Sequence, residues 1–135
     1  MWVARSARDA MLAHADEGAP EEVVGVLVGE RTADGEDRVT RVERARNAAD
    51  TPRTRYELDP AEQVELVDDI EAAGDAVVGF YHSHPDGPEG PSATDARRAA
   101  WEGYVYAIVS LAGEASLGAW RWTGEEFDRL PVAVG

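Results

Sequence analysis

The sequence of 135 residues contains no cysteine and no lysine. Without cysteine there are no disulfides and no thiolate ligands, so a metal ion would have to be bound by histidine, aspartate or glutamate. No apolar run approaches the length of about 18 residues that a membrane-spanning helix needs, and residues 1–9 do not resemble a signal peptide. We therefore expect a cytoplasmic protein that makes no membrane contact and folds as one domain over residues 1–135.

Positive charge is also scarce. Aspartate and glutamate number 27 against 13 basic residues, all arginine, which gives a formal net charge of −14. A surface of this kind repels nucleic acid and anionic membranes, so neither is expected as a partner. A GC-rich genome explains the preference for arginine. A salt-adapted cytoplasm explains the acid excess and the absence of lysine together, because high ionic strength screens the repulsion.

Hydrophobic periodicity predicts an α/β (α+β) fold in which helices pack on a mixed sheet. Helices are expected at 4–17, from the N-cap Asp59 to Gly74, and at 93–102, and strands at 23–29, 37–45, 76–82, 104–111, 116–122 and 126–134, with a further short strand possible at 55–58. Val64, Leu66, Val67 and Ile70 would form the apolar stripe of the second helix. Tyr104, Tyr106, Trp120 and Trp122 are expected in core and sheet packing.

The residues that could bind a metal ion or catalyse a reaction lie at and after the end of the strand expected at 76–82. His82 and His84 lie two residues apart, so their imidazoles point to the same face of a strand. A loop rich in proline and glycine follows, and Ser92-Ala-Thr-Asp95 then opens a helix. The third histidine, His14, has no histidine neighbour and is expected at the surface or at the edge of the core.

Two imidazoles facing a carboxylate suggest a catalytic metal site, with the fourth position left to water. The residues also permit simpler interpretations: His82 and His84 as a polar strand end, and Ser92 with Asp95 as a helix capping box. Non-haem iron, which is held by two histidines and one carboxylate, competes with zinc on ligand type.

The complete pattern resembles the JAMM (MPN-plus) metallopeptidases. His82-Ser83-His84, seven residues, Ser92, two residues and Asp95 match that family's motif, and residues 20–29 are similar to its segment P-x-E-x-x-G-x-L-x-G. The likeness extends over essentially the whole chain. It implies the JAMM/MPN mixed sheet with a cytidine-deaminase-like architecture.

The resemblance also implies roles for individual residues. His82, His84 and Asp95 would bind Zn²⁺, Glu22 would act as general base and acid, and Ser92 would donate a hydrogen bond to the oxyanion. The expected reaction is hydrolysis of a peptide or isopeptide bond.

Two neighbours of these residues need separate interpretations. Glu21 is the neighbouring candidate for the base. The glutamate of the family segment stands three residues before a glycine, and the glycine here is Gly25, so the resemblance favours Glu22. Ser83 points to the face opposite the histidines and is expected in packing or in support of the site.

The short chain is most similar to compact prokaryotic members of the family, of the desampylase type. These cleave after the Gly-Gly end of a ubiquitin-like modifier, and a hydrolase acting on a sulfur-carrier protein is the alternative. The modifier tail would add as a strand near Arg53–Leu58, where Arg53 and Arg55 could pair with acids of the modifier. A non-catalytic module that binds ubiquitin-like proteins is the alternative from another class.

Overall fold

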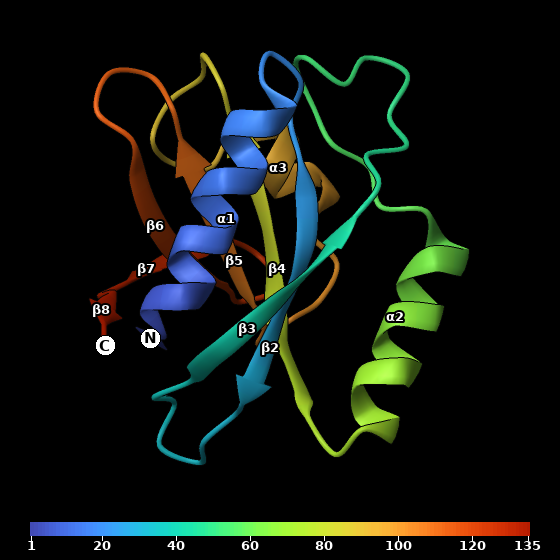
Figure 1. The fold of residues 1–135 in the computed structure, drawn as a ribbon, viewed down its shortest axis with the longest axis vertical. Coiled ribbons are helices and arrows are strands. Elements are labelled where there is room, and N and C mark those ends of the chain that lie inside the picture. Colours follow the sequence, from blue (N-terminus) through green and yellow to red (C-terminus); the bar gives the residue numbers. More distant parts are fainter.

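The computed structural model describes all residues from 1 to 135 and contains three helices and eight strands (Figure 1). The helices are α1 (Arg5–Gly18), α2 (Pro60–Ala72) and α3 (Ala93–Arg98). The strands are β1 (Trp2–Val3), β2 (Val24–Glu30), β3 (Arg38–Ala45), β4 (Ala76–His84), β5 (Val105–Ser110), β6 (Ser116–Trp122), β7 (Phe127–Leu130) and β8 (Ala133–Val134). The mixed sheet with packed helices that the sequence predicts is confirmed.

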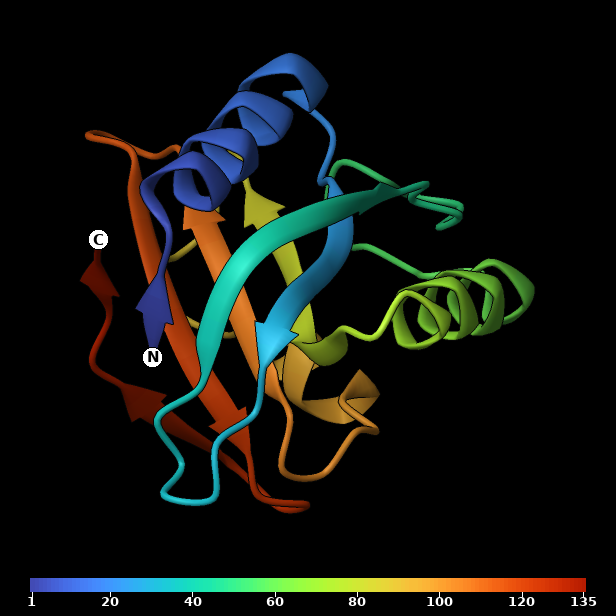
Figure 2. The same ribbon diagram turned by 60° about the horizontal axis from the view of Figure 1, so that its bottom comes forward.

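All eight strands form one sheet in the order β7-β6-β5-β4-β2-β3-β1-β8. β4 and β5 pair in parallel, whereas β2 is antiparallel to both β3 and β4. β7 and β8 lie at opposite ends of this order although only two residues separate them in the chain, so the sheet curls round (Figure 2). The prediction of one strand over 126–134 is wrong because Pro131 has no N–H group with which to continue a ladder.

The helices cover the two faces of the sheet. Helix α1 buries Ala7, Met11 and Ala15 against one face, in a core that includes Tyr81 and Val105. Helices α2 and α3 lie against the other face, where Ile70 and Ala96 pack with Phe80 and Tyr106 (Figure 1). None of the three helices combines the length and the apolar character needed to cross a bilayer.

Two helices differ from the prediction. Val64 of α2 is 60% exposed and does not belong to the apolar stripe, since the helix reaches the core mainly through Ile70. Helix α3 ends at Arg98 instead of continuing to residue 102. The N–H groups of Ala100 and Trp101 donate to the Tyr106 hydroxyl at 3.3 and 3.2 Å and so leave the helical pattern.

Strand β2 is the central, doubly covered strand that its apolar run predicts. Gly25 is required there because the ring of Tyr81, on the neighbouring strand β4, lies where a Cβ would be. Gly29 is required because the backbone carbonyl of Arg38 approaches it closely. Two glycines of the family-like segment therefore have packing reasons that are independent of catalysis.

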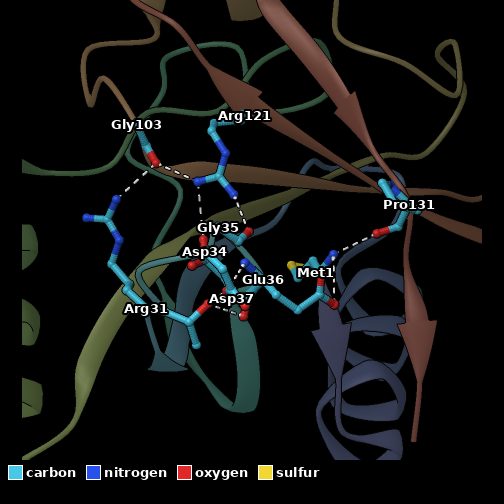
Figure 3. A network of polar contacts seen from close by, with 10 residues as sticks. Met1, Arg31, Asp34, Gly35, Glu36, Asp37, Gly103, Arg121 and Pro131 are labelled. Atoms are coloured by element: carbon cyan, nitrogen blue, oxygen red, sulfur yellow. Dashed lines mark hydrogen bonds and ion pairs between the residues drawn. The ribbon is translucent and has the colours of Figure 1, made fainter.

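A polar network at the far end of the sheet joins three segments (Figure 3). Nη1 of Arg121 donates to Oδ2 of Asp37 at 3.2 Å and to the Gly103 carbonyl at 2.8 Å, and Nη2 donates to the Gly35 carbonyl at 3.1 Å. Asp37 is buried, and Arg121 forms an ion pair with its carboxylate. The network fixes the β2–β3 turn against β6 and the loop that precedes β5.

Candidate metal centre

The two histidines lie at the carboxyl end of β4, which extends beyond the predicted range to His84. Both imidazoles are on the sheet face that carries α3, and both side chains are buried. β2 and β5 flank β4 on either side, so the backbone at this point is held by two ladders. The strand therefore presents both rings from a fixed frame.

Asp95 comes from the first turn of α3. Ser92 Oγ accepts a hydrogen bond from the Asp95 N–H at 3.1 Å, and the Ser92 N–H donates to Asp95 Oδ2 at 2.9 Å. This is the capping box that the sequence permits, and it coexists with the metal-site interpretation because Asp95 is buried and turned toward the histidines. The Ser92 O–H remains free to donate, since a hydroxyl can accept and donate at once.

The structure brings the three predicted ligand atoms together. Nε2 of His82 lies 3.2 Å from Nε2 of His84, and Oδ2 of Asp95 lies 3.2 and 3.0 Å from these two nitrogens. Nitrogen and oxygen atoms bound to one tetrahedral zinc ion are about 3.3 Å apart, which follows from metal–ligand distances of about 2.0 to 2.1 Å. The donor set and its spacing therefore fit such an ion.

A contact outside this triangle sets the protonation of His84, one of the predicted ligands. Nδ1 of His84 lies 2.8 Å from the Pro88 carbonyl, to which it can only donate. The neutral imidazole then has a lone pair at Nε2, which faces the Asp95 carboxylate. Two electron-rich atoms 3.0 Å apart in a buried site require a cation or a proton between them.

The same contacts shift the pKa values of the three groups. Burial lowers the pKa of His82, against the opposing effect of Asp95. Burial also disfavours the charged form of His84, but hydrogen bonds to Asp95 and Pro88 outweigh it and raise its pKa. Burial works against ionisation of Asp95 as well, yet hydrogen bonds from both histidines keep its pKa well below the usual range. A proton on His84 and a metal ion are thus alternative ways to balance Asp95.

Glu22 joins this cluster from the strand next to β4. Val24 pairs with His82 in the antiparallel ladder, so Glu22 comes opposite His84. One of its carboxylate oxygens and the ligand atoms of both histidines lie within 4.8 Å of one another. Its Oε1 is buried without a hydrogen-bond partner, whereas Glu21 is exposed. Burial raises the pKa of Glu22 to about 7, an effect that His84 opposes and Asp95 strengthens.

The backbone around Glu22 is held by three contacts with segments that lie far away in the sequence. The Glu22 N–H donates to the Pro52 carbonyl at 2.7 Å, and the Glu22 carbonyl accepts from Nδ2 of Asn47 at 2.9 Å. Ser83 Oγ accepts from the Val23 N–H at 2.9 Å. The sequence did not single out Asn47, because a side chain that bridges distant segments has no local sequence pattern.

Two cavities adjoin the cluster. A polar cleft of about 350 Å³ is lined by Glu22, His84 and Ser92, together with Arg53 and the loop after β4. A second cavity of about 230 Å³ has mostly apolar walls that include Tyr56, Phe80 and Trp101. The Tyr56 ring stacks on His82, with ring centroids 4.2 Å apart. Tyr56 is the second residue near the site that the sequence did not single out.

The remaining candidates lie apart from the triangle. Arg53 is exposed and faces the polar cleft, while Arg55 is half-buried in the same segment. Leu58 makes one isolated bridge with Asn47, so the short strand suggested for 55–58 does not form. His14 lies at the edge of the core, as expected, and its Nδ1 is 2.8 Å from the Tyr81 hydroxyl on the opposite face of the sheet.

Known proteins are similar to this chain in both sequence and fold. The family described as "Prokaryotic homologs of the JAB domain" matches residues 4–123. The chain is 51% identical to a desampylase of Haloferax volcanii, over 98% of this chain and 94% of that protein. It is 34% identical to a probable TtuB-protein conjugate cleaving protease of Thermus thermophilus, over 84% of this chain and 72% of that protein. It is 38% identical to a CysO-cysteine peptidase of Mycobacterium tuberculosis, over 76% of this chain and 67% of that protein.

Solved structures agree. A protein of Desulfitobacterium hafniense superposes with a TM-score of 0.89 at 32% identity, over 100% of this chain and 93% of that one. A JAB1/MPN domain protein of Archaeoglobus fulgidus gives a TM-score of 0.64 at 19% identity, over 100% of this chain and 96% of that one, and shows the shared fold. The chain therefore belongs to the prokaryotic branch of the JAB/MPN family, the JAMM family to which its histidine, serine and aspartate motif pointed.

Proposed function

We propose that this protein is a zinc-dependent isopeptidase that hydrolyses the bond after the C-terminal Gly-Gly of a ubiquitin-like modifier. The observation that carries the proposal is the buried cluster of His82, His84 and Asp95 with the carboxylate of Glu22 beside it. Two neutral imidazoles and a carboxylate are a usual ligand set for catalytic zinc, and the extra carboxylate is what a hydrolase needs to move protons.

In this proposal His82, His84 and Asp95 hold the zinc ion. When bound, zinc supplies Lewis acidity that polarises the scissile carbonyl and makes water acidic enough to react near neutral pH. The chain fixes these ligands from two sides: the ladders of β4 hold the histidines, and the capping box holds Asp95.

Glu22 is the proposed general base and acid. Its carboxylate faces the polar cleft beside His84, so it can take a proton from the attacking water and pass it to the leaving amine nitrogen. Ser92 lines the same cleft, and its O–H is free to donate to the oxyanion that develops at the carbonyl. The two groups act on the same reacting centre from β2 and from the start of α3.

The relatives guide the substrate assignment. The Haloferax relative is named a desampylase, which supports removal of a small modifier from target lysines. The names of the Thermus and Mycobacterium relatives refer to TtuB conjugates and to CysO-cysteine, which keeps processing of a sulfur-carrier protein as the second candidate. A Gly-Gly tail suits a narrow approach to the cleft, next to Arg53 and the segment that ends at Leu58.

The decisive experiment combines metal analysis with cleavage of a modifier–lysine conjugate. We expect bound zinc and release of free modifier with an intact Gly-Gly end. Glu22→Gln should retain zinc and lose turnover, and a strong chelator should abolish turnover in the wild type. Full activity of Glu22→Gln would refute the mechanism. Tight modifier binding without zinc or turnover would instead favour a non-catalytic binding module.

A further inference from the structure

The two proposed histidine ligands are held in different ways. His84 is oriented by a hydrogen bond from Nδ1 to the Pro88 carbonyl. The hydrogen bonds of His82 run through Nε2, the atom proposed to bind the metal, so they do not fix the ring in the metal-bound state. Its ring plane is supported by Tyr56, whose ring lies over it at a centroid distance of 4.2 Å and an interplanar angle of 25°.

Tyr56 lies in an irregular segment, yet its backbone is held at both flanking peptide groups by one side chain. Nδ2 of Asn47 donates to the Arg55 carbonyl at 3.0 Å, just before Tyr56. Oδ1 of Asn47 accepts from the Glu57 N–H at 3.0 Å, just after it. The same Nδ2 donates to the Glu22 carbonyl at 2.9 Å. The side-chain amide of Asn47 thus connects the Tyr56 segment, whose ring supports His82, to Glu22, the proposed base.

The chemistry of this contact requires an amide. Both carbonyl partners of Asn47 face its NH₂ group, and both N–H partners, those of Ala49 and Glu57, face its oxygen. Aspartate has the same shape but would place an oxygen against two carbonyl oxygens. Asn47 is also the only asparagine in the chain.

We propose that Asn47 and Tyr56 are positioning residues of the metal centre. Tyr56 holds the plane of the His82 ring by stacking, and Asn47 keeps Tyr56 and Glu22 in one frame. The inference rests on the proposed function, because it assigns these residues to the same site. Groups that orient metal ligands typically contribute 10- to 100-fold to metal affinity, and we expect an effect of about this size.

The competing explanation is that Tyr56 only fills space. It lines the apolar cavity together with Phe80 and Trp101, so its loss could lower the stability of the protein without any effect on the metal. Metal affinity, measured on folded protein, separates the two explanations, because a space-filling residue does not change the orientation of His82.

The test is the zinc dissociation constant of the full chain, measured by competition with a chromogenic chelator. Tyr56→Leu should bind zinc about 10- to 100-fold more weakly, whereas Tyr56→Phe, which keeps the stacked ring, should stay within about threefold of wild type. Asn47→Asp should weaken binding in the same direction. Tyr104→Leu is the matched control, because Tyr104 packs on Trp101 away from the histidines; its zinc affinity should not change.

Two further readouts complete the design. At saturating zinc, Asn47→Asp should lower kcat about tenfold or more with little change in KM, because Glu22 loses its fixed place. The visible spectrum of the cobalt-substituted protein should change in Tyr56→Leu and remain wild-type in Tyr56→Phe. If Tyr56→Leu does not fold, Tyr56→Met and Asn47→Asp decide the outcome in the same assays.

Unchanged zinc affinity and an unchanged cobalt spectrum in both the stack-removing and the Asn47→Asp variants would overturn the inference. Cleavage of a modifier conjugate by the wild-type protein decides the proposed function separately. A wild-type protein that binds zinc but cleaves nothing would remove that function, while the ratio of zinc affinities would still decide the role of Asn47 and Tyr56.

Discussion

Replacing Glu22 with glutamine should stabilise the metal-free protein at alkaline pH while it removes turnover. Burial raises the pKa of this carboxyl from 4.5 to about 7, with His84 opposing and Asp95 adding to the rise. Between these two pH values the unfolded chain gives up a proton that the folded chain keeps. The free energy of unfolding therefore falls as pH rises through this window, and the full cost is present above it.

The size of the effect follows from the same two values. The difference between 4.5 and about 7 corresponds to about 3 kcal/mol of lost stability at pH 8. Glutamine has nearly the same shape as glutamate and no charge. The free energy of unfolding of Glu22→Gln should therefore exceed that of the wild type by about this amount at pH 8 and by little at pH 4. Because Glu22 is the proposed general base, its replacement should lower kcat about 10²- to 10⁴-fold.

The assay is urea unfolding of chelator-treated wild type and Glu22→Gln, in one salt solution, from pH 4 to pH 8. Added zinc should reduce the difference in stability between the two proteins at pH 8, because a neighbouring cation stabilises the Glu22 carboxylate. If the stability difference between the two proteins does not depend on pH, the reasoning from burial fails. If Glu22→Gln is less stable than wild type at pH 8, Glu22 makes a favourable interaction that the structure does not contain.

Three other predictions concern separate parts of the molecule. Asp95→Asn should reduce zinc affinity by more than about 100-fold, since Asp95 is a proposed ligand and a ligand matters more than the groups that orient it; zinc retained after dialysis would contradict this. Burial, with a smaller effect of Arg44, lowers the pKa of His14 to about 4. Stability should therefore fall as pH drops from 6.5 toward 4, and His14→Gln should lack this part of the slope of the urea midpoint. Arg121→Met should cost about 3 kcal/mol in urea unfolding because it leaves Asp37 buried and unpaired, and adding Asp37→Asn should restore part of the loss.

The features that the sequence predicted well are those with a local period or a local hydrogen bond. His82 and His84 share a face because strand side chains alternate, and the Ser92–Asp95 turn is a capping box that four residues define. The central strand was predictable from its continuous apolar run.

The features that were missed depend on contacts between distant segments. Strands β1 and β8 have only two residues each, and they exist because β1 pairs with β3 and β8 pairs with β1. The early end of α3 depends on the Tyr106 hydroxyl, which belongs to the next strand. Asn47 and Tyr56 reach the site through contacts with Glu22 and His82 that no local pattern reports.

The register between β2 and β4 connects the two halves of the site, and it is set on the face away from the chemistry. Tyr81 lies over Gly25, and Ser83 accepts from the Val23 N–H, so both back-facing residues of β4 fix β2 at one position. A slip of one residue would turn Glu22 to the opposite face. A larger residue at Gly25 should therefore lower activity by displacing Glu22, even though Gly25 contacts neither the ligands nor the cleft.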